Sequence, residues 1–125
     1  MFELTGKVAI VTGAATGLGQ AICVAFAKQG ANVVPTDRPG VSLDETVKKC
    51  QEAGAPEVFP QAMDVTDEAG IKAAVAAVKD HFGHIDILAS NAGMNKPMPA
   101  ENVTPEIWDA HFAVNIKGGF FVAQA

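Results

Sequence analysis

The chain has 125 residues, of which 49% are hydrophobic and 18% are charged, and its formal net charge is −5 at pH 7. This composition is sufficient for one folded domain over residues 1–125 and excludes an intrinsically disordered chain. The acidic balance argues against a nucleic-acid partner, and no apolar run approaches the roughly 18 residues of a membrane span. The first residues lack the form of a signal peptide, so we expect a cytoplasmic protein without a membrane partner.

The first part of the chain alternates between strand and helix patterns. Residues 8–12 are apolar and β-branched, which predicts a buried parallel strand. The apolar spacing over residues 17–29 predicts a helix that Gly30 ends. Residues 31–37 predict a second strand, and Pro35 should cause a bulge or a distortion there because proline cannot donate to a ladder.

The alternation continues through the middle of the chain. Ser42, followed three residues later by Glu45, forms a capping-box pattern with Ser42 as the N-cap of a helix that Gly54 closes. Residues 57–63 predict the third strand, which is interrupted by Pro60.

The remaining residues predict two further helices and one strand. Residues 67–82 keep a helical apolar face and Gly83 stops this helix, after which residues 85–90 predict the fourth strand. A loop follows, and Thr104-Pro105 is typical of an N-cap followed by proline in the first turn. We expect the last helix to run from there to the end of the chain.

The order βαβαβαβα predicts a parallel sheet with helices on both faces. Right-handed crossovers restrict the topology, and the doubly wound solution has the strand order 3-2-1-4. The predicted fold class is therefore α/β, a partial Rossmann-type doubly wound sheet.

The two cysteines, Cys23 and Cys50, fall in separate predicted helices. In a protein that is not secreted, such thiols are typically small buried residues rather than a disulfide. No spacing of cysteine and histidine resembles a metal site, and we expect none.

Glycines cluster between the first predicted strand and helix. Gly13 would let the chain turn sharply, Gly17 would let the backbone approach a diphosphate, and Gly19 would let the helix pack closely. The N–H groups of the helix start, which includes Leu18, and the hydroxyl of Thr16 would favour an anion. The alternative is a tight strand-to-helix turn that binds no ligand.

Asp37 ends the second predicted strand, where a carboxylate can accept both hydroxyls of an adenosine ribose. Its charge would repel a 2′-phosphate, which favours NAD over NADP as the cofactor. Arg38 is the opposing feature, because it could pair with that phosphate. Alternatively, Asp37 is an ordinary turn residue at the end of a strand.

Together these motifs resemble the short-chain dehydrogenase/reductase family. The family's T-G-x-x-x-G-x-G corresponds to residues 12–19, its acidic residue after the third strand to Asp64 in Asp64-Val65, its N-N-A-G to Ser90-Asn91-Ala92-Gly93, and its N-x-x-G to Asn115-Ile116-Lys117-Gly118. The resemblance implies that Asp64 and Val65 meet the adenine and that Ala92 and Gly93 leave room for the cofactor. It implies that Asn91 belongs to the cofactor site, although Ser90 replaces the family's first Asn. It also implies that Asn115 distorts its helix and holds a water of the proton relay.

The resemblance implies an oxidoreductase that transfers hydride between NAD and an alcohol or ketone, with a sugar or sugar acid as one candidate substrate. It covers about the first half of a typical member, and the family's catalytic Ser, Tyr and Lys are expected outside it, since the chain has no tyrosine. We therefore expect this chain alone to be inactive. Two alternatives remain open, namely a dinucleotide-binding module without catalysis and one half of a split enzyme.

Self-association is expected from the last part of the chain. The fourth predicted strand would be an apolar edge of the sheet, which favours pairing with another strand. The last helix carries more large apolar side chains than one sheet face can cover, namely Trp108, Phe112, Ile116, Phe120 and Phe121. The simplest closed solution is a two-fold homo-oligomer formed through one of these elements.

Overall fold

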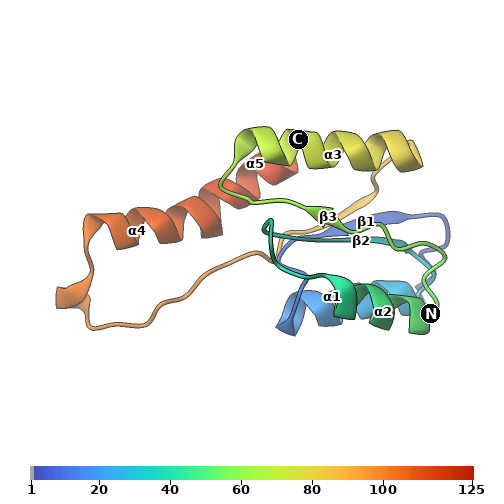
Figure 1. The fold of residues 1–125 in the computed structure, drawn as a ribbon, viewed down its shortest axis with the longest axis horizontal. Helices are drawn as coiled ribbons and strands as arrows, with labels where there is room; N and C mark the ends of the chain where they lie inside the picture. Colours follow the sequence, from blue (N-terminus) through green and yellow to red (C-terminus); the bar gives the residue numbers. More distant parts are fainter. Residues whose placement is uncertain (1) are drawn as a thin grey trace.

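The computed structural model describes residues 2–125 and contains one four-stranded parallel sheet with helices on both faces (Figure 1). The strand order is β3-β2-β1-β4, so the predicted fold class and order are confirmed. The strands are β1 (Val8–Val11), β2 (Asn32–Asp37), β3 (Gln61–Ala62) and β4 (Ile87–Ala89). The helical elements are α1 (Gly17–Lys28), α2 (Asp44–Glu52), α3 (Glu68–Phe82), η1 (Ala100–Asn102), α4 (Pro105–Phe112), η2 (Ala113–Gly118) and α5 (Gly119–Gln124).

The sheet is buried on both faces, with α1 and α2 on one side and α3 and α5 on the other (Figure 1). Side chains alternate between the two faces of β1, as they do in any strand. Val11 packs with Cys23 of α1 and Cys50 of α2, whereas Val8 and Ile10 belong to the cluster that includes Val78 of α3. Burial on both faces explains why this strand is an unbroken apolar run.

The expected distortion at Pro35 is confined to one side of β2. Towards β1 the register is regular, and Pro35 pairs with Val11. Val33 and Asp37 make their backbone hydrogen bonds towards the β3 side, and because this direction alternates along a strand, Pro35 faces β3 as well. The β2–β3 ladder is accordingly interrupted beyond the isolated bridge of Val33 to Val58.

The structure differs from the prediction in the length of the third strand and in the start of α2. The third strand is limited to β3, two residues long, because the prolines of β2 and of its own segment remove ladder donors. The capping box is wrong: Leu43 is the N-cap of α2, and the Ser42 hydroxyl accepts the Asp44 N–H at 3.3 Å instead of capping the third helical residue.

Other helix ends are confirmed. Gly83 follows α3 with a left-handed φ of +84°. The Thr104 hydroxyl accepts the Ile107 N–H at 3.2 Å, and Pro105 occupies the first position of α4.

The predicted last helix runs without a break to Gln124, but it is not α-helical throughout. Residues Ala113–Gly118 form a π-helical turn, η2, between α4 and α5. Asn115 lies in the middle of this turn, which agrees with the helix distortion implied by the family resemblance. Figure 1 shows that α4 and the loop before it extend away from the sheet, whereas α5 lies beside α3.

Both cysteines are buried and both thiols are free in the described part of the chain, as expected. The pKa of the Cys23 thiol is raised by its hydrogen bond with Cys50 and by burial. Within residues 2–125, no helix is both long and apolar enough to cross a membrane.

Candidate functional site

A cavity of about 350 Å³ lies at the carboxyl ends of the strands, where ligands bind in open α/β sheets. Eight of the predicted site residues line it, namely Gly13, Thr16, Asp37, Asp64, Val65, Asn91, Ala92 and Gly93. They come from the four segments that follow the four strands. Sequence positions up to 80 residues apart therefore share one cavity.

The glycines of the turn between β1 and α1 are needed for two different structural reasons. Gly13 and Gly17 have left-handed φ values of +63° and +59°, which side chains disfavour. A Cβ atom on Gly19 would lie 2.1 Å from the carbonyl oxygen of Gly13. Gly19 thus allows the first turn of α1 to rest directly on the preceding loop.

The start of α1 is suited to an anion. Its first N–H groups, at Gly17, Leu18 and Gly19, have no intrahelical acceptor, and its first turn holds no acidic residue. Thr16 is the N-cap, and its hydroxyl caps no N–H group within residues 2–125. Leu18 is 71% exposed, and none of Gly17, Leu18 and Gly19 is among the residues that line the cavity.

Thr12 and Asn91 connect the ends of β1 and β4. The buried Thr12 hydroxyl accepts the N–H groups of Asn91 and Ala92, both at 2.9 Å. The Asn91 amide in turn donates to the carbonyl oxygens of Thr12 and Gly13, both at 3.2 Å. Thr12 was not among the predicted site residues, although it opens the glycine motif.

Asp37 lies beside the turn as well as beside the cavity. Its Oδ2 accepts the Ala15 N–H at 3.0 Å, and its Oδ1 accepts the Arg38 N–H at 2.8 Å. Each oxygen keeps further lone pairs for a ligand hydroxyl. The carboxylate is therefore held in place by the same loop that surrounds the start of α1.

Asp64 is held as a carboxylate by its neighbours. Its Oδ1 accepts the Thr66 hydroxyl at 2.6 Å and the Thr66 N–H at 2.9 Å. These bonds lower the pKa of Asp64, and the positive charge of Arg38 lowers it further. Arg38 lines the same cavity as the two carboxylates.

Asn115 does not line the cavity but positions a segment that does. Its Oδ1 accepts the Met94 N–H at 2.7 Å and its Nδ2 donates to the Met94 carbonyl at 2.9 Å. A Cβ on Gly93 would lie 3.3 Å from this Oδ1. The π-helical turn therefore anchors the segment after β4, and Met94, which sequence reasoning missed, lines the cavity.

The last glycine of the N-x-x-G motif serves close packing. A Cβ on Gly118 would lie 2.8 Å from both the Cγ2 and the carbonyl oxygen of Val65. Gly118 thus allows η2 to approach the segment after β3. The motif holds two sides of the cavity together, one through Asn115 and the other through Gly118.

The described lining residues favour binding over proton transfer. The titratable groups among them are Asp37, Arg38 and Asp64. Carboxylates accept hydrogen bonds from hydroxyl or amino groups, and the guanidinium stays charged. With the N–H groups of α1, this set matches a ligand that has an anionic centre and a hydroxylated sugar.

Comparisons with known proteins agree with this geometry. A model of the short chain dehydrogenase family matches residues 7–125. The D-threitol dehydrogenase of Mycolicibacterium smegmatis is 41% identical to the chain, and the match covers 99% of this chain and 47% of that enzyme.

Solved structures show the same relation. A putative short-chain alcohol dehydrogenase from Sinorhizobium meliloti is 38% identical with a TM-score of 0.92, over 98% of this chain and 48% of that one. The 3-ketoacyl-(acyl-carrier-protein) reductase from Brucella melitensis, complexed with NADH, is 39% identical with a TM-score of 0.83, over 98% of this chain and 49% of that one. The chain spans about half the length of these relatives. It belongs to the short-chain dehydrogenase family.

Proposed function

We propose that this chain binds the adenosine diphosphate part of a nicotinamide dinucleotide and is the cofactor-binding portion of an oxidoreductase that acts on an alcohol or ketone. One observation carries the proposal: Thr16, the N-cap of the uncompensated start of α1, and Asp37 line one cavity. The first suits a diphosphate, and the second suits the ribose hydroxyls. The NADH named with the Brucella melitensis reductase supports the ligand class.

In this proposal each segment after a strand has its own part of the cofactor. The N–H groups of residues 17–19 and the Thr16 hydroxyl hold the diphosphate. Asp37 accepts the ribose hydroxyls, and Asp64-Val65 borders the adenine. Residues 91–93 leave room for the nicotinamide half, which supplies hydride transfer when the cofactor is bound.

We further propose that NAD is preferred over NADP. The Asp37 carboxylate would face the 2′-phosphate of NADP, and two negative charges within a few ångströms repel each other. Arg38 is adjacent, but its charge also serves Asp64, whose pKa it lowers. Repulsion at Asp37 therefore outweighs attraction by Arg38.

The proposed hydride-transfer activity belongs to a protein of the relatives' length, and its substrate is an alcohol or ketone, with sugar alcohols favoured by the D-threitol dehydrogenase relative. We propose that the 125-residue chain alone has no turnover, because it contains no tyrosine to act as the family's proton donor. Turnover that persists through repeated purification and disappears in Asn115→Ala would contradict this proposal.

The test of binding is a titration of the purified chain with ADP, NAD and NADP, followed through backbone amide NMR signals. We expect weak binding, with the largest shifts at residues 13–19, and a lower Kd for NAD than for NADP. Signals that stay unchanged at millimolar ADP would overturn the binding proposal. Tighter binding of NADP would overturn only the proposed preference.

We also propose that the chain forms a homo-oligomer through the helix that contains α4, η2 and α5. Trp108, Phe112, Ile116 and Phe120 are 58%, 43%, 58% and 61% exposed and recur every four residues along this helix. No charged residue belongs to the stripe, so two copies could pack it against itself around a two-fold axis.

A further inference from the structure

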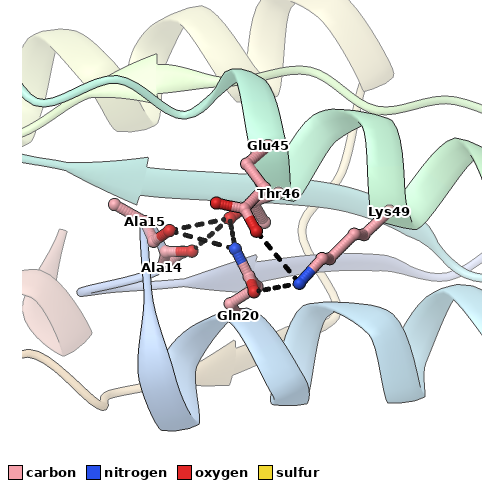
Figure 2. Close-up of polar contacts among 6 residues, drawn as sticks. All are labelled: Ala14, Ala15, Gln20, Glu45, Thr46 and Lys49. Carbon is pink, nitrogen blue, oxygen red and sulfur yellow. Dashed lines mark hydrogen bonds and ion pairs between the residues drawn. The ribbon is translucent and has the colours of Figure 1, made fainter.

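The turn between β1 and α1 is held from behind by side chains of α1 and α2. Thr46 of α2 donates its hydroxyl to the Ala14 carbonyl oxygen at 2.7 Å. Gln20 of α1 donates its amide to the Ala15 carbonyl oxygen at 3.1 Å, and the Thr46 hydroxyl lies 3.2 Å from the same oxygen. Figure 2 shows these contacts converging on the turn.

Each proton that Thr46 and Gln20 can donate has one acceptor in this network. The Thr46 hydroxyl is fully buried, and its single proton suits the shorter contact, to Ala14. The Gln20 amide has two protons, one for Ala15 and one for the Thr46 oxygen at 3.0 Å. The two side chains thus form a closed network with the two carbonyl oxygens.

A surface ion pair fixes the orientation of the Gln20 amide. Lys49 donates to the Gln20 Oε1 at 2.9 Å and pairs with Glu45 at 3.1 Å (Figure 2). With the oxygen of Gln20 facing Lys49, its nitrogen faces the turn. The network therefore extends from the buried turn to the exposed face of α2.

Holding these carbonyl groups also sets where the neighbouring N–H groups point. In a trans peptide the C=O and N–H bonds are directed oppositely. With the Ala14 carbonyl on Thr46, the Ala15 N–H faces Asp37, where it donates at 3.0 Å. With the Ala15 carbonyl on Gln20, the N–H of Thr16 is directed away from Gln20, and Thr16 itself lines the cavity.

We propose that Thr46, acting with Gln20, is a positioning residue that orients the turn for a diphosphate. Neither side chain lines the cavity, so both act through the peptide groups of residues 14–16. The inference rests on the proposed binding of a dinucleotide and adds to it Thr46, a residue 27 positions after the end of the glycine motif at Gly19. A purely structural role, in which Thr46 only joins α2 to the turn, would affect all ligands alike.

The test compares ADP with adenosine, because only ADP carries the diphosphate. In Thr46→Val the shape is kept and the hydroxyl is lost, and we expect the Kd for ADP to rise about three- to tenfold, the loss of one hydrogen bond. We expect the Kd for adenosine to change less than about twofold. Thr46→Ser, which keeps the hydroxyl, should match the wild type.

A second pair of variants provides a matched control. Lys49→Met and Lys72→Met each break an exposed i,i+4 ion pair, with Glu45 on α2 and with Glu68 on α3. Only Lys49 contacts Gln20. We therefore expect a weaker ADP complex for Lys49→Met and an unchanged one for Lys72→Met.

Each outcome decides between the proposals. If the wild type binds no ADP, the proposed function and this inference both fail. If the wild type binds ADP and Thr46→Val binds it as tightly, or loses ADP and adenosine by the same factor, only the inference fails. Should Thr46→Val not fold by circular dichroism, Gln20→Met decides through the same ratio of ADP to adenosine affinity.

Discussion

Asp37 has two tasks in one carboxylate. One oxygen accepts the Ala15 N–H and so braces the turn, while the charge faces the region proposed for the ribose. A test of cofactor preference must remove the charge of Asp37 and keep its hydrogen bond with the Ala15 N–H. Asn keeps one acceptor oxygen for the Ala15 N–H, although it gives up the bond that the other carboxylate oxygen accepts from the Arg38 N–H.

We predict that Asp37→Asn narrows the preference for NAD over NADP to less than about twofold, since the repulsion of the 2′-phosphate is lost. Isothermal titration calorimetry with both cofactors measures the ratio. Asp80→Asn removes the same charge from the exposed end of α3 and should keep the wild-type ratio. A preference that survives in Asp37→Asn would assign the discrimination elsewhere.

At Asp64 the prediction concerns the pKa of the carboxyl group. We expect Thr66→Ala to raise the pKa of Asp64 towards its ordinary value. The hydrogen bond from the Thr66 hydroxyl is lost, and the bond from the Thr66 N–H is weakened because the loop is held less firmly. Carboxyl-carbon NMR during a pH titration gives the pKa, and Thr66→Ser serves as the control. An unchanged pKa in Thr66→Ala would mean that the positive charge of Arg38 dominates.

The sign of the linked stability follows from the lowered pKa. A carboxyl whose pKa is lower in the folded than in the unfolded chain stabilises the fold fully above the unfolded pKa and loses this contribution as pH falls through the folded pKa. The wild type should therefore lose stability over that acidic range. Thr66→Ala should lose less there, as measured by urea unfolding at stepped pH.

Site residues differ in how far the sequence could reveal them. Asp37 could be predicted because it ends a strand pattern and parallel strands end at one edge, whereas Asp64 was indicated by the family resemblance. Thr46 could not, because it is an ordinary polar residue inside a helix. Its contact with Ala14 depends on how α2 docks, which no local pattern encodes.

Among the elements, the strand–turn–helix unit of β1 and α1 depends most on close approach. A Cβ on Gly19 would overlap the Gly13 carbonyl, which is backbone and cannot rotate away. A Cβ on Gly17 would meet nothing within 4 Å among the described residues, so only its positive φ opposes a side chain. Substitutions at Gly19 and Gly17 therefore separate the cost of a steric overlap from the cost of a left-handed backbone conformation.

We predict that Gly19→Ala lowers the free energy of unfolding by about 3 kcal/mol, since α1 must move away from the turn. Gly17→Ala should cost only about 1 kcal/mol, the cost of left-handed backbone. Gly40→Ala, also at positive φ in open space, is the control for conformation alone. Urea denaturation measures all three, and equal losses at Gly17 and Gly19 would contradict the steric explanation.

The elements that were predicted correctly are those whose signals are local. Gly83 ends α3 through its left-handed backbone conformation, and Thr104 begins α4 through its hydroxyl, so both predictions are confirmed. Ser42 carries the same kind of signal but is not the N-cap, because the chain enters α2 one residue later. The π-helical turn at Asn115 has no local pattern of its own, and only the family resemblance indicated a distortion there.

At the scale of the whole molecule, the proposed association through the exposed side chains of Trp108, Phe112, Ile116 and Phe120 can be tested in solution. We predict that light scattering finds a mass above the 12.9 kDa of one chain, increasing with concentration. Trp108→Glu and Phe120→Glu should each shift the population towards monomers, because a buried charge opposes packing of the stripe.

The matched control is Phe2→Glu, which changes an even more exposed aromatic residue outside the stripe. It should leave the mass distribution unchanged. A single species at the monomer mass for the wild type across a wide concentration range would rule out association through this surface.

The π-helical turn gives the chain some latitude in length between residues 113 and 118. A turn closed by i→i+5 bonds holds an extra residue relative to an α-helix, so deleting one residue there would restore regular winding and leave α5 facing the sheet much as before. Val122 would then keep its place beside Met63 and Ile71. The same deletion inside α5, before Val122, would turn that side chain away by about 100°. A change in length is therefore better tolerated in the π-helical turn than in the regular helix after it, as long as Asn115 is kept.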